Sequence, residues 1–434
     1  MKTRMALLLA AGALAFPASA EDLNWKFYGT LMTFVDNVQT TGVTKDTAAN
    51  NSFVTINPAA TNAPSRNRMT CGTSNLGFKG DYKVNSDLKV TWQYESSVSP
   101  DGDAPNTWGG RNCGLGLASQ SWGQVLVGQW DTPYKMPILM TGAIRGLDPF
   151  DNNITGNPGF NVQGTVTATG RVGGTGATTK YDAAFNRRQG NSIQYWSPTI
   201  SGFSGRLMYS VNEGKTTASA TAASINPTLL SALLTYKIGT LTVAYAYEQH
   251  KDYFGLTAMC STTAAGVTTP TGVTSNAAIL ANPHSKDEGH ELGIYYVIPS
   301  TGTRLVFLGE QLKYHNDDTV AGKINEYKRF AWFASVQQTF LQDHKVWFNY
   351  GQAQEGDGTF VGGASANTNG LGAKQFALCY AYALGKQADV FASYYTVKND
   401  KAGTYGPFPQ LSMGNGVNAG GEVKGFGVGM LYTF

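Results

Sequence analysis

The chain contains no long hydrophobic run beyond its first residues. No later segment approaches the roughly 18 uninterrupted apolar residues that a membrane-spanning helix requires. The 42% of residues that are hydrophobic are instead mixed evenly with polar ones. This distribution excludes a bundle of transmembrane helices. If the protein resides in a membrane, β-strands must cross the bilayer.

The first residues form a separate segment. Lys2 and Arg4 precede the apolar run Met5–Phe16, and the small residues Ala18, Ser19 and Ala20 follow it. A basic start, a short apolar core and a small-residue cleavage site are the parts of a secretory signal peptide. We therefore predict a signal peptide over residues 1–20 and a single domain over residues 21–434, because no linker-like segment divides the remainder.

An excess of charge of one sign is also lacking. The 32 basic residues nearly balance the 29 acidic ones, and only 14% of all residues are charged. Nucleic-acid-binding proteins carry a concentrated basic surface, so we expect no nucleic-acid partner. A balanced total does not exclude charges that are sorted to different places inside a pore.

Catalytic motifs are missing as well. The sequence contains neither a G-x-S-x-G turn nor an H-E-x-x-H segment, and its five histidines have unrelated spacings. An enzyme needs an activated nucleophile or a base that a third group positions. We therefore expect no catalytic residue, no cofactor and no metal site. A membrane-embedded lipase or protease stays open as a rival class.

Cysteine is scarce, with four residues in the chain. Their spacing matches no metal-binding pattern. Exported proteins can form disulfides, and Cys71 and Cys113 each lie near the start of a predicted strand, so the sequence allows a bridge between them. Cys260 lies in a predicted loop and Cys379 in a predicted strand, and we do not expect these two to pair.

The last stretch, Gly421–Phe434, is the clearest feature that is present. Every second residue from Phe426 is apolar, and the residues between them are mostly small. The apolar residues are Phe426, Val428, Met430, Tyr432 and Phe434. Side chains of a strand alternate between its two faces, so this segment predicts a strand with one apolar face. An ordinary sandwich strand would show the same pattern, but a membrane barrel exposes such a face to lipid.

Similar alternation recurs along the chain. It is clear in Leu88–Ser96, Leu241–His250 and Lys328–Phe340, and weaker in Trp25–Val35, where Met32 and Phe34 break the pattern. Each run has about the ten residues that a tilted strand needs to cross a bilayer.

The connections between these runs alternate in length. Seven are short and turn-like: 83–87, 120–123, 198–202, 237–239, 299–303, 341–343 and 385–387. Eight are long and rich in Thr, Ala, Gly and Asn: 37–67, 99–110, 131–190, 213–228, 253–286, 315–327, 355–372 and 399–420. Short turns at one end and long loops at the other are typical of outer-membrane barrels. Fifteen connections predict sixteen strands.

A barrel of this size must be closed and hollow. In lipid an unpaired backbone group costs several kcal/mol, so the sheet can have no free edge. About sixteen strands make a barrel too wide for side chains to fill. We therefore predict an all-β, transmembrane antiparallel β-barrel with a water-filled interior.

Four landmarks along the mature chain resemble the Gram-negative general porins, particularly the branch common in β-proteobacteria. They are Ser74–Gly80 with Asn85–Leu88, Arg111–Leu117 with Trp122–Gln129, Arg188–Pro198 with Gly202 and Phe203, and the terminal Phe434. The resemblance implies a homotrimer whose third loop, here 131–190, folds into the lumen and narrows it. It also implies contact with outer-membrane lipid and lipopolysaccharide, and assembly through a machinery that reads the last strand with its Phe434 signature.

The resemblance further implies a pore eyelet at which acidic loop residues face basic wall residues. The acidic candidates are Asp148 and Asp151, and the basic ones are Lys79, Arg111 and Arg188. Strand parity directs Lys79 and Arg188 into the lumen, whereas Arg111 shares its parity with Leu115 and Leu117. Where the family commonly has a lumenal Arg, this chain has Asn75, which weakens the basic side.

The function we expect is passive diffusion of small hydrophilic solutes and ions through a pore in the outer membrane of a Gram-negative bacterium. A channel specific for a sugar, an organic acid or phosphate has the same fold and stays an alternative. A barrel that anchors an adhesin is a further one.

Overall fold

The computed structural model describes residues 23–71, 74–102, 108–141, 154–155, 184–210, 215, 217, 226–253, 255–256, 284–317, 323–406 and 417–434. The predicted signal peptide, Asp148, Asp151 and Cys260 lie outside these residues. Within the described ranges, no helix has both the length and the apolar character needed to cross a bilayer.

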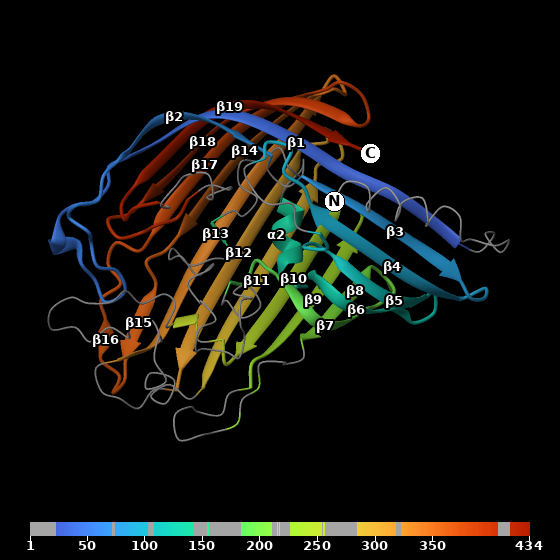
Figure 1. The fold of residues 1–434 in the computed structure, drawn as a ribbon, viewed down its shortest axis with the longest axis horizontal. Coiled ribbons are helices and arrows are strands. Elements are labelled where there is room, and N and C mark those ends of the chain that lie inside the picture. Colours follow the sequence, from blue (N-terminus) through green and yellow to red (C-terminus); the bar gives the residue numbers. More distant parts are fainter. Residues whose placement is uncertain are drawn as a thin grey trace, which may run out of the picture.

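The described residues form one antiparallel sheet that closes into a barrel (Figure 1). Its first half contains β1 (Leu23–Thr41), β2 (Ala63–Thr70), β3 (Asn75–Lys83), β4 (Leu88–Ser97), β5 (Cys113–Ser119), β6 (Gly123–Asp131), β7 (Arg188–Trp196), β8 (Phe203–Ser210), β9 (Thr228–Ile238) and β10 (Leu241–Lys251). Its second half contains β11 (Ser285–Val297), β12 (Arg304–Asn316), β13 (Ile324–Phe340), β14 (His344–Ala353), β15 (Asp357–Phe360), β16 (Ser365–Ala366), β17 (Ala373–Ala383), β18 (Ala388–Asn399) and β19 (Glu422–Thr433).

These segments make the sixteen barrel strands that the sequence predicts. β2 and β3 both pair with β1 and together form one interrupted strand. β15 and β16 form a small hairpin that pairs with the start of β13, beyond the part of β13 that pairs with β14. Among the described strands, the seven short turns and eight long connections also alternate as predicted. The β12–β13 connection spans only 317–323, because both strands extend further than expected.

The first and last strands close the barrel. β1 pairs with β19 from Thr30 opposite Thr433 to Thr41 opposite Glu422. The seam continues through Phe434, whose backbone nitrogen donates to the Gly29 carbonyl oxygen at 3.1 Å and whose backbone oxygen accepts from the Gly29 nitrogen at 3.0 Å. Closure leaves the ring of described barrel strands without a free edge, as a bilayer requires.

Alternation of side chains sorts the two faces of the barrel. In β19, Phe426, Val428 and Met430 are 57%, 53% and 49% exposed on the outer face, whereas the intervening glycines face inward. The same two-residue period holds over most of β10 and β13, whereas β4 shows no regular alternation in burial. The outer face is therefore apolar and suited to lipid.

The predicted limits of the first strand are too short. β1 runs from Leu23 to Thr41 without interruption. Met32 and Phe34, which break the sequence pattern, face the interior and are only 7% and 4% exposed. Phe34 stacks on Phe391 of β18, with ring centroids 5.5 Å apart. Apolar packing inside the barrel thus accounts for the irregular pattern.

A short helix lies inside the barrel. α2 (Lys135–Thr141) follows β6 directly and packs against β10, β11 and β12. The Tyr295 hydroxyl of β11 donates to the Pro137 carbonyl oxygen at 2.7 Å. Figure 1 shows α2 within the ring of strands. The start of the third long loop is therefore fixed to the inner wall, as the resemblance implies.

The prediction that a disulfide could join Cys71 and Cys113 is wrong, because both residues are free thiols. The Cys71 sulfur lies 3.3 Å from the Ser99 hydroxyl, beyond the end of β4. The Cys113 sulfur instead contacts the Glu95 backbone, further down β4, at 3.4 Å. The two thiols lie beside different parts of β4, and a bridge forms only when the Cα atoms approach within about 7 Å. Cys379 is also free and lies beside Ser393.

Substituting Gly427 tests the closure of the barrel. A Cβ at this position would lie 2.5 Å from the Val35 carbonyl oxygen and 2.6 Å from the Asp36 Cβ, both on the facing strand. Overpacking of this kind typically costs about 1–3 kcal/mol. We expect Gly427→Val to lower the urea midpoint of unfolding, followed by heat-modifiable electrophoretic mobility, while Val428→Leu on the lipid face leaves it nearly unchanged. Equal midpoints would contradict this packing.

Candidate functional site

Two lysines face each other on the inner wall. Lys26 of β1 and Lys79 of β3 are direct cross-strand partners, and both border cavities of about 360 and 510 Å³ inside the barrel. The Lys79 ammonium group lies 4.6 Å from the centroid of the Tyr28 ring. Lys79 therefore lies where the sequence places it, and Lys26 joins it.

Arg111 lies near this wall but is engaged by a carboxylate. Its guanidinium forms an ion pair with Glu95 of β4, and Arg111 is only 7% exposed. The other Glu95 oxygen accepts a hydrogen bond from the Tyr28 hydroxyl at 2.8 Å. Arg111 lines neither of these two cavities and lies within the wall behind them.

Arg188 is paired in a similar way. Its Nε atom lies 3.0 Å from Asp131 Oδ1, and the Lys135 ammonium group lies 3.2 Å from the same oxygen. Asn112 donates from Nδ2 to Asp131 Oδ2 at 2.8 Å. Asp131 ends β6, Arg188 begins β7 and Lys135 begins α2. One buried carboxylate therefore connects both ends of the long loop.

A bulge in β6 directs two consecutive side chains inward. The register with β7 shifts between Gly128 and Trp130, and Gly128 has a positive φ of 148°. A Cβ on Gly128 would lie 2.3 Å from the Cys113 carbonyl oxygen. After the bulge, Trp130 and Asp131 border the same 510 Å³ cavity. Bulges commonly re-aim side chains in this manner, and simple strand parity cannot predict the result.

A second tryptophan and an arginine continue the wall. The rings of Trp130 and Trp196 meet edge to face, with centroids 5.5 Å apart. The Arg206 guanidinium of β8 lies 4.4 Å from the centroid of the Trp196 ring. Trp196 borders the 360 Å³ cavity and an adjoining cavity of about 540 Å³, which Arg206 also lines.

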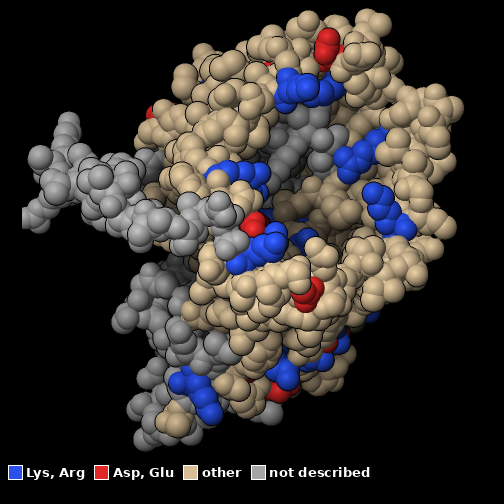
Figure 2. All heavy atoms as spheres, turned by 90° about the vertical axis from the view of Figure 1, so that its right-hand side faces the viewer, with Lys and Arg blue, Asp and Glu red and all other residues tan. Residues whose placement is uncertain are grey.

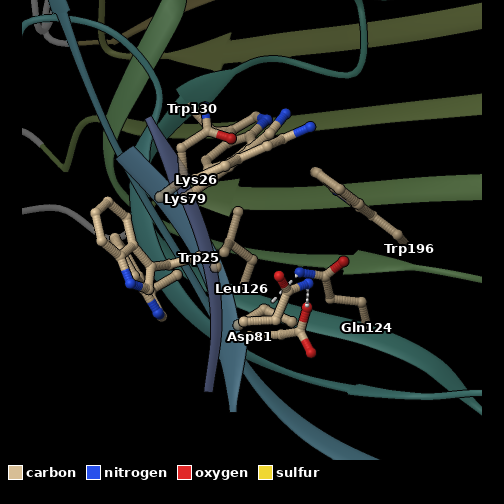
Figure 3. A pocket seen from close by; sticks show the side chains of 13 residues that line it. Trp25, Lys26, Lys79, Asp81, Gln124, Leu126, Trp130 and Trp196 are labelled. Carbon is tan, nitrogen blue, oxygen red and sulfur yellow. Dashed lines mark hydrogen bonds between the residues drawn. The ribbon is translucent and has the colours of Figure 1, made fainter. Parts of the chain in front are cut away.

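Figure 3 shows the arrangement of the 360 Å³ cavity. Lys26 and Lys79 extend side by side toward Trp130, and Trp196 lies across from them. Trp25 lies on the opposite face of the strands, in agreement with its 56% exposure on the outer surface. The cavity therefore combines ammonium groups with indole rings.

This wall carries an excess of positive charge. We call it the basic wall and define it by the charged residues that line the cavities or pair with those that do: Lys26, Lys79, Asp81, Glu95, Arg111, Asp131, Lys135, Arg188 and Arg206. Six of these are basic and three are acidic. Viewed from the end with the short turns, the molecule is hollowed at its centre, with Lys and Arg around the hollow and few Asp or Glu (Figure 2). Lys26, Lys79 and Arg206 line the cavities directly, together with the carboxylates Asp81, Glu95 and Asp131.

Acidic side chains gather on the opposite wall, but they are buried. Glu248 and Glu310 are fully buried, and Glu291 is 1% exposed. The Arg329 guanidinium lies 3.2 Å from Glu310, and His250 Nε2 lies 2.8 Å from Glu248. Tyr134, Phe185 and neighbouring aromatic residues cover this cluster. These carboxylates line none of the three cavities described above.

Several members of the site are not predicted from the sequence. Strand parity places Lys26 on the same inner face as Tyr28, so the alternation pattern of β1 could have identified Lys26. Glu95 and Asp131 neutralise two predicted basic candidates, and only the fold shows these pairings. Asp148 and Asp151 lie outside the described residues. Asn75, where a lumenal Arg is common in the resembling family, faces the interior and is 6% exposed.

The family model for Gram-negative porins matches residues 6–402 of the chain. The chain belongs to the Gram-negative porin family. This porin is 27% identical to the major outer membrane protein P.IA of Neisseria meningitidis serogroup B over 148 residues. That match covers 33% of this chain and 30% of the Neisseria protein, so the chain spans about a third of the curated relative's length.

Solved structures share its fold. An anion-selective porin from Comamonas acidovorans superposes with a TM-score of 0.64 at 18% identity, over 95% of this chain and 100% of that one. The trimer form of OmpT from Vibrio cholerae gives a TM-score of 0.55 at 14% identity, over 95% and 100% of the two chains. Family and fold place this porin in the outer membrane of a Gram-negative bacterium.

Replacing Asp131 tests the ion-pair cluster at the base of the loop. Asp131→Asn removes the carboxylate that Arg188 and Lys135 share, at a site only 4% exposed. Breaking a buried ion pair typically costs about 3–5 kcal/mol, so we expect a large fall in the urea midpoint. Asp81→Asn breaks an exposed pair with Lys89 and is expected to cost less than about 1 kcal/mol. Similar losses in both variants would refute a structural role specific to Asp131.

Proposed function

We propose that this porin forms a water-filled channel through which small hydrophilic solutes and ions diffuse passively. One observation carries the proposal: a closed barrel has an apolar outer face and a polar interior that contains cavities. A barrel of about sixteen strands leaves an aqueous channel. The mechanism requires no chemical step and no cofactor, so the proposal places no catalysis in the chain.

The proposed channel favours anions. Charges that line the narrow part of a pore set its selectivity. Lys26, Lys79 and Arg206 line the cavities, and none of them is in an ion pair with an acidic residue among the described residues. The carboxylates that line the same cavities, Asp81, Glu95 and Asp131, are each paired with another basic residue. The structural neighbour from Comamonas acidovorans is named an anion-selective porin, and its likeness in fold supports this direction.

The proposed assembly is a homotrimer, for which the trimer form of the Vibrio cholerae OmpT structure is the supporting likeness. Insertion into lipid and lipopolysaccharide, with Phe434 as the assembly signature, belongs to the same proposal. Residues 1–20 act in it as a removable signal peptide. Conductance in a planar bilayer that rises in groups of three equal steps would support the trimer, whereas single independent steps would refute it.

Neutralising the two facing lysines tests the anion preference. Two unit charges about 4 Å apart interact by roughly 1 kcal/mol in water, so Lys26→Gln/Lys79→Gln is expected to lower the chloride-over-potassium permeability ratio several-fold. The measurement is the reversal potential in a planar bilayer under a KCl gradient. Lys386→Gln/Lys401→Gln removes the same charge from exposed connections and is expected to change little. A correctly folded protein that shows no conductance would refute the diffusion proposal itself.

Asp148 and Asp151 are proposed to contribute the acidic side of the eyelet. Removing these charges reduces attraction for cations, so Asp148→Asn/Asp151→Asn is expected to raise the chloride-over-potassium ratio in the same assay. Asp317→Asn/Asp343→Asn, which alters two exposed carboxylates, is the matched control. An equal change of the permeability ratio in both double variants would refute the assignment of Asp148 and Asp151 to the eyelet.

A further inference from the structure

The Lys26–Lys79 pair is electrostatically unfavourable by itself. Direct cross-strand partners hold their Cβ atoms about 4.5–5.5 Å apart, and like charges in this position are destabilising. The nearest carboxylates along the strands also border these cavities, but each pairs with another basic residue: Asp81 lies 3.2 Å from Lys89, and Glu95 pairs with Arg111. Within the described residues neither lysine has an acidic ion-pair partner. An anion from solution would relieve the repulsion.

Two indole rings border the same cavity as the lysines. Trp130 comes from the bulge of β6 and Trp196 from the end of β7, and both line the 360 Å³ space (Figure 3). The Trp196 ring is held in place, because its Nε1 atom donates to Gln194 Oε1 at 2.9 Å and Arg206 lies over it at 4.4 Å. The volume is within the range of about 300–1,000 Å³ typical of small-molecule sites.

We propose that Lys26, Lys79, Trp130 and Trp196 form a binding slot for small aromatic carboxylates. The two ammonium groups attract the carboxylate, and the indole rings stack on a planar aromatic ring. A neutral sugar leaves the lysine charges unbalanced, and an aliphatic anion has no ring to stack on the indoles. The slot rests on the proposed diffusion function and defines one solute class within it.

Binding in such a slot must be weak. A channel conducts a solute only when binding favours entry and still permits exit. Aromatic stacking adds a modest preference, which corresponds to about a 3- to 10-fold difference in affinity between an aromatic and a saturated ring. The slot is therefore expected to raise the flux of dilute aromatic carboxylates while chloride still passes.

The test compares three probes on the intact porin in a planar bilayer. Benzoate has the charge and the aromatic ring, cyclohexanecarboxylate has the charge with a saturated ring, and benzamide has the ring without the charge. We expect benzoate to reduce the KCl current at a half-blocking concentration about 3- to 10-fold lower than that of cyclohexanecarboxylate. Benzamide is expected to block least, because it cannot pair with the lysines.

Variants assign the effect to the slot. Trp196→Leu and Trp130→Leu are each expected to reduce the difference between benzoate and cyclohexanecarboxylate, with block expressed relative to each variant's own KCl current. Lys26→Gln/Lys79→Gln is expected to weaken block by both carboxylates. Trp332→Leu is the matched control, because Trp332 lies on the outer face of β13 and stacks on Phe307, with ring centroids 6.5 Å apart.

Two results would overturn the slot. Equal half-blocking concentrations for benzoate and cyclohexanecarboxylate in the unaltered porin would show that no aromatic preference exists, and this comparison stands even if a tryptophan variant fails to fold. Persistence of the full difference in both folded tryptophan variants would show that it arises elsewhere. Absence of any KCl conductance is a different result, because it refutes the diffusion proposal and not the slot alone.

Discussion

The structure depends on one constraint, the need to pair every backbone hydrogen-bonding group that faces hydrocarbon. β1 and β19 meet this need across twelve facing positions and on to Phe434. Closure in turn fixes which side of each strand faces lipid. It also places glycine at position 427, where the facing strand leaves no room for a Cβ. The apolar exterior and the polar interior are both consequences of the closed ring.

Depth within the wall, more than the number of charges, decides what the pore surface presents. Glu95 and Asp131 are buried and balance Arg111, Arg188 and Lys135 inside the wall. Glu248, Glu291 and Glu310 are buried on the far side, beneath aromatic residues. The three carboxylates that line the described cavities, Asp81, Glu95 and Asp131, are each in an ion pair, whereas Lys26, Lys79 and Arg206 are in none among the described residues. The unpaired charges at these cavities are therefore positive, although the chain as a whole is nearly neutral.

Much of the fold could be predicted from the sequence, because a two-residue period and the lengths of the connections are local properties. The sixteen strands and the inward direction of Lys79 follow from that period. Less of the candidate site could be predicted from the sequence. The pairing of Arg188 with Asp131 joins residues separated by a long loop, and the bulge at Gly128 re-aims Trp130 and Asp131 against simple parity. The proposed disulfide failed for a related reason: similar places along two strands do not bring their thiols together in space.

The contacts at the base of the third loop have a consequence for how this porin can change over evolution. Asp131 and Arg188 hold the two ends of the loop together, and the Thr132 nitrogen donates to the Arg187 carbonyl oxygen at 3.2 Å. With its ends fixed in this way, a loop can gain or lose residues at small entropic cost. Insertions between them need not disturb the register of β6 and β7. The wall and the segment that enters the lumen can therefore diverge at different rates, one conserving the barrel and the other adapting the channel to new solutes.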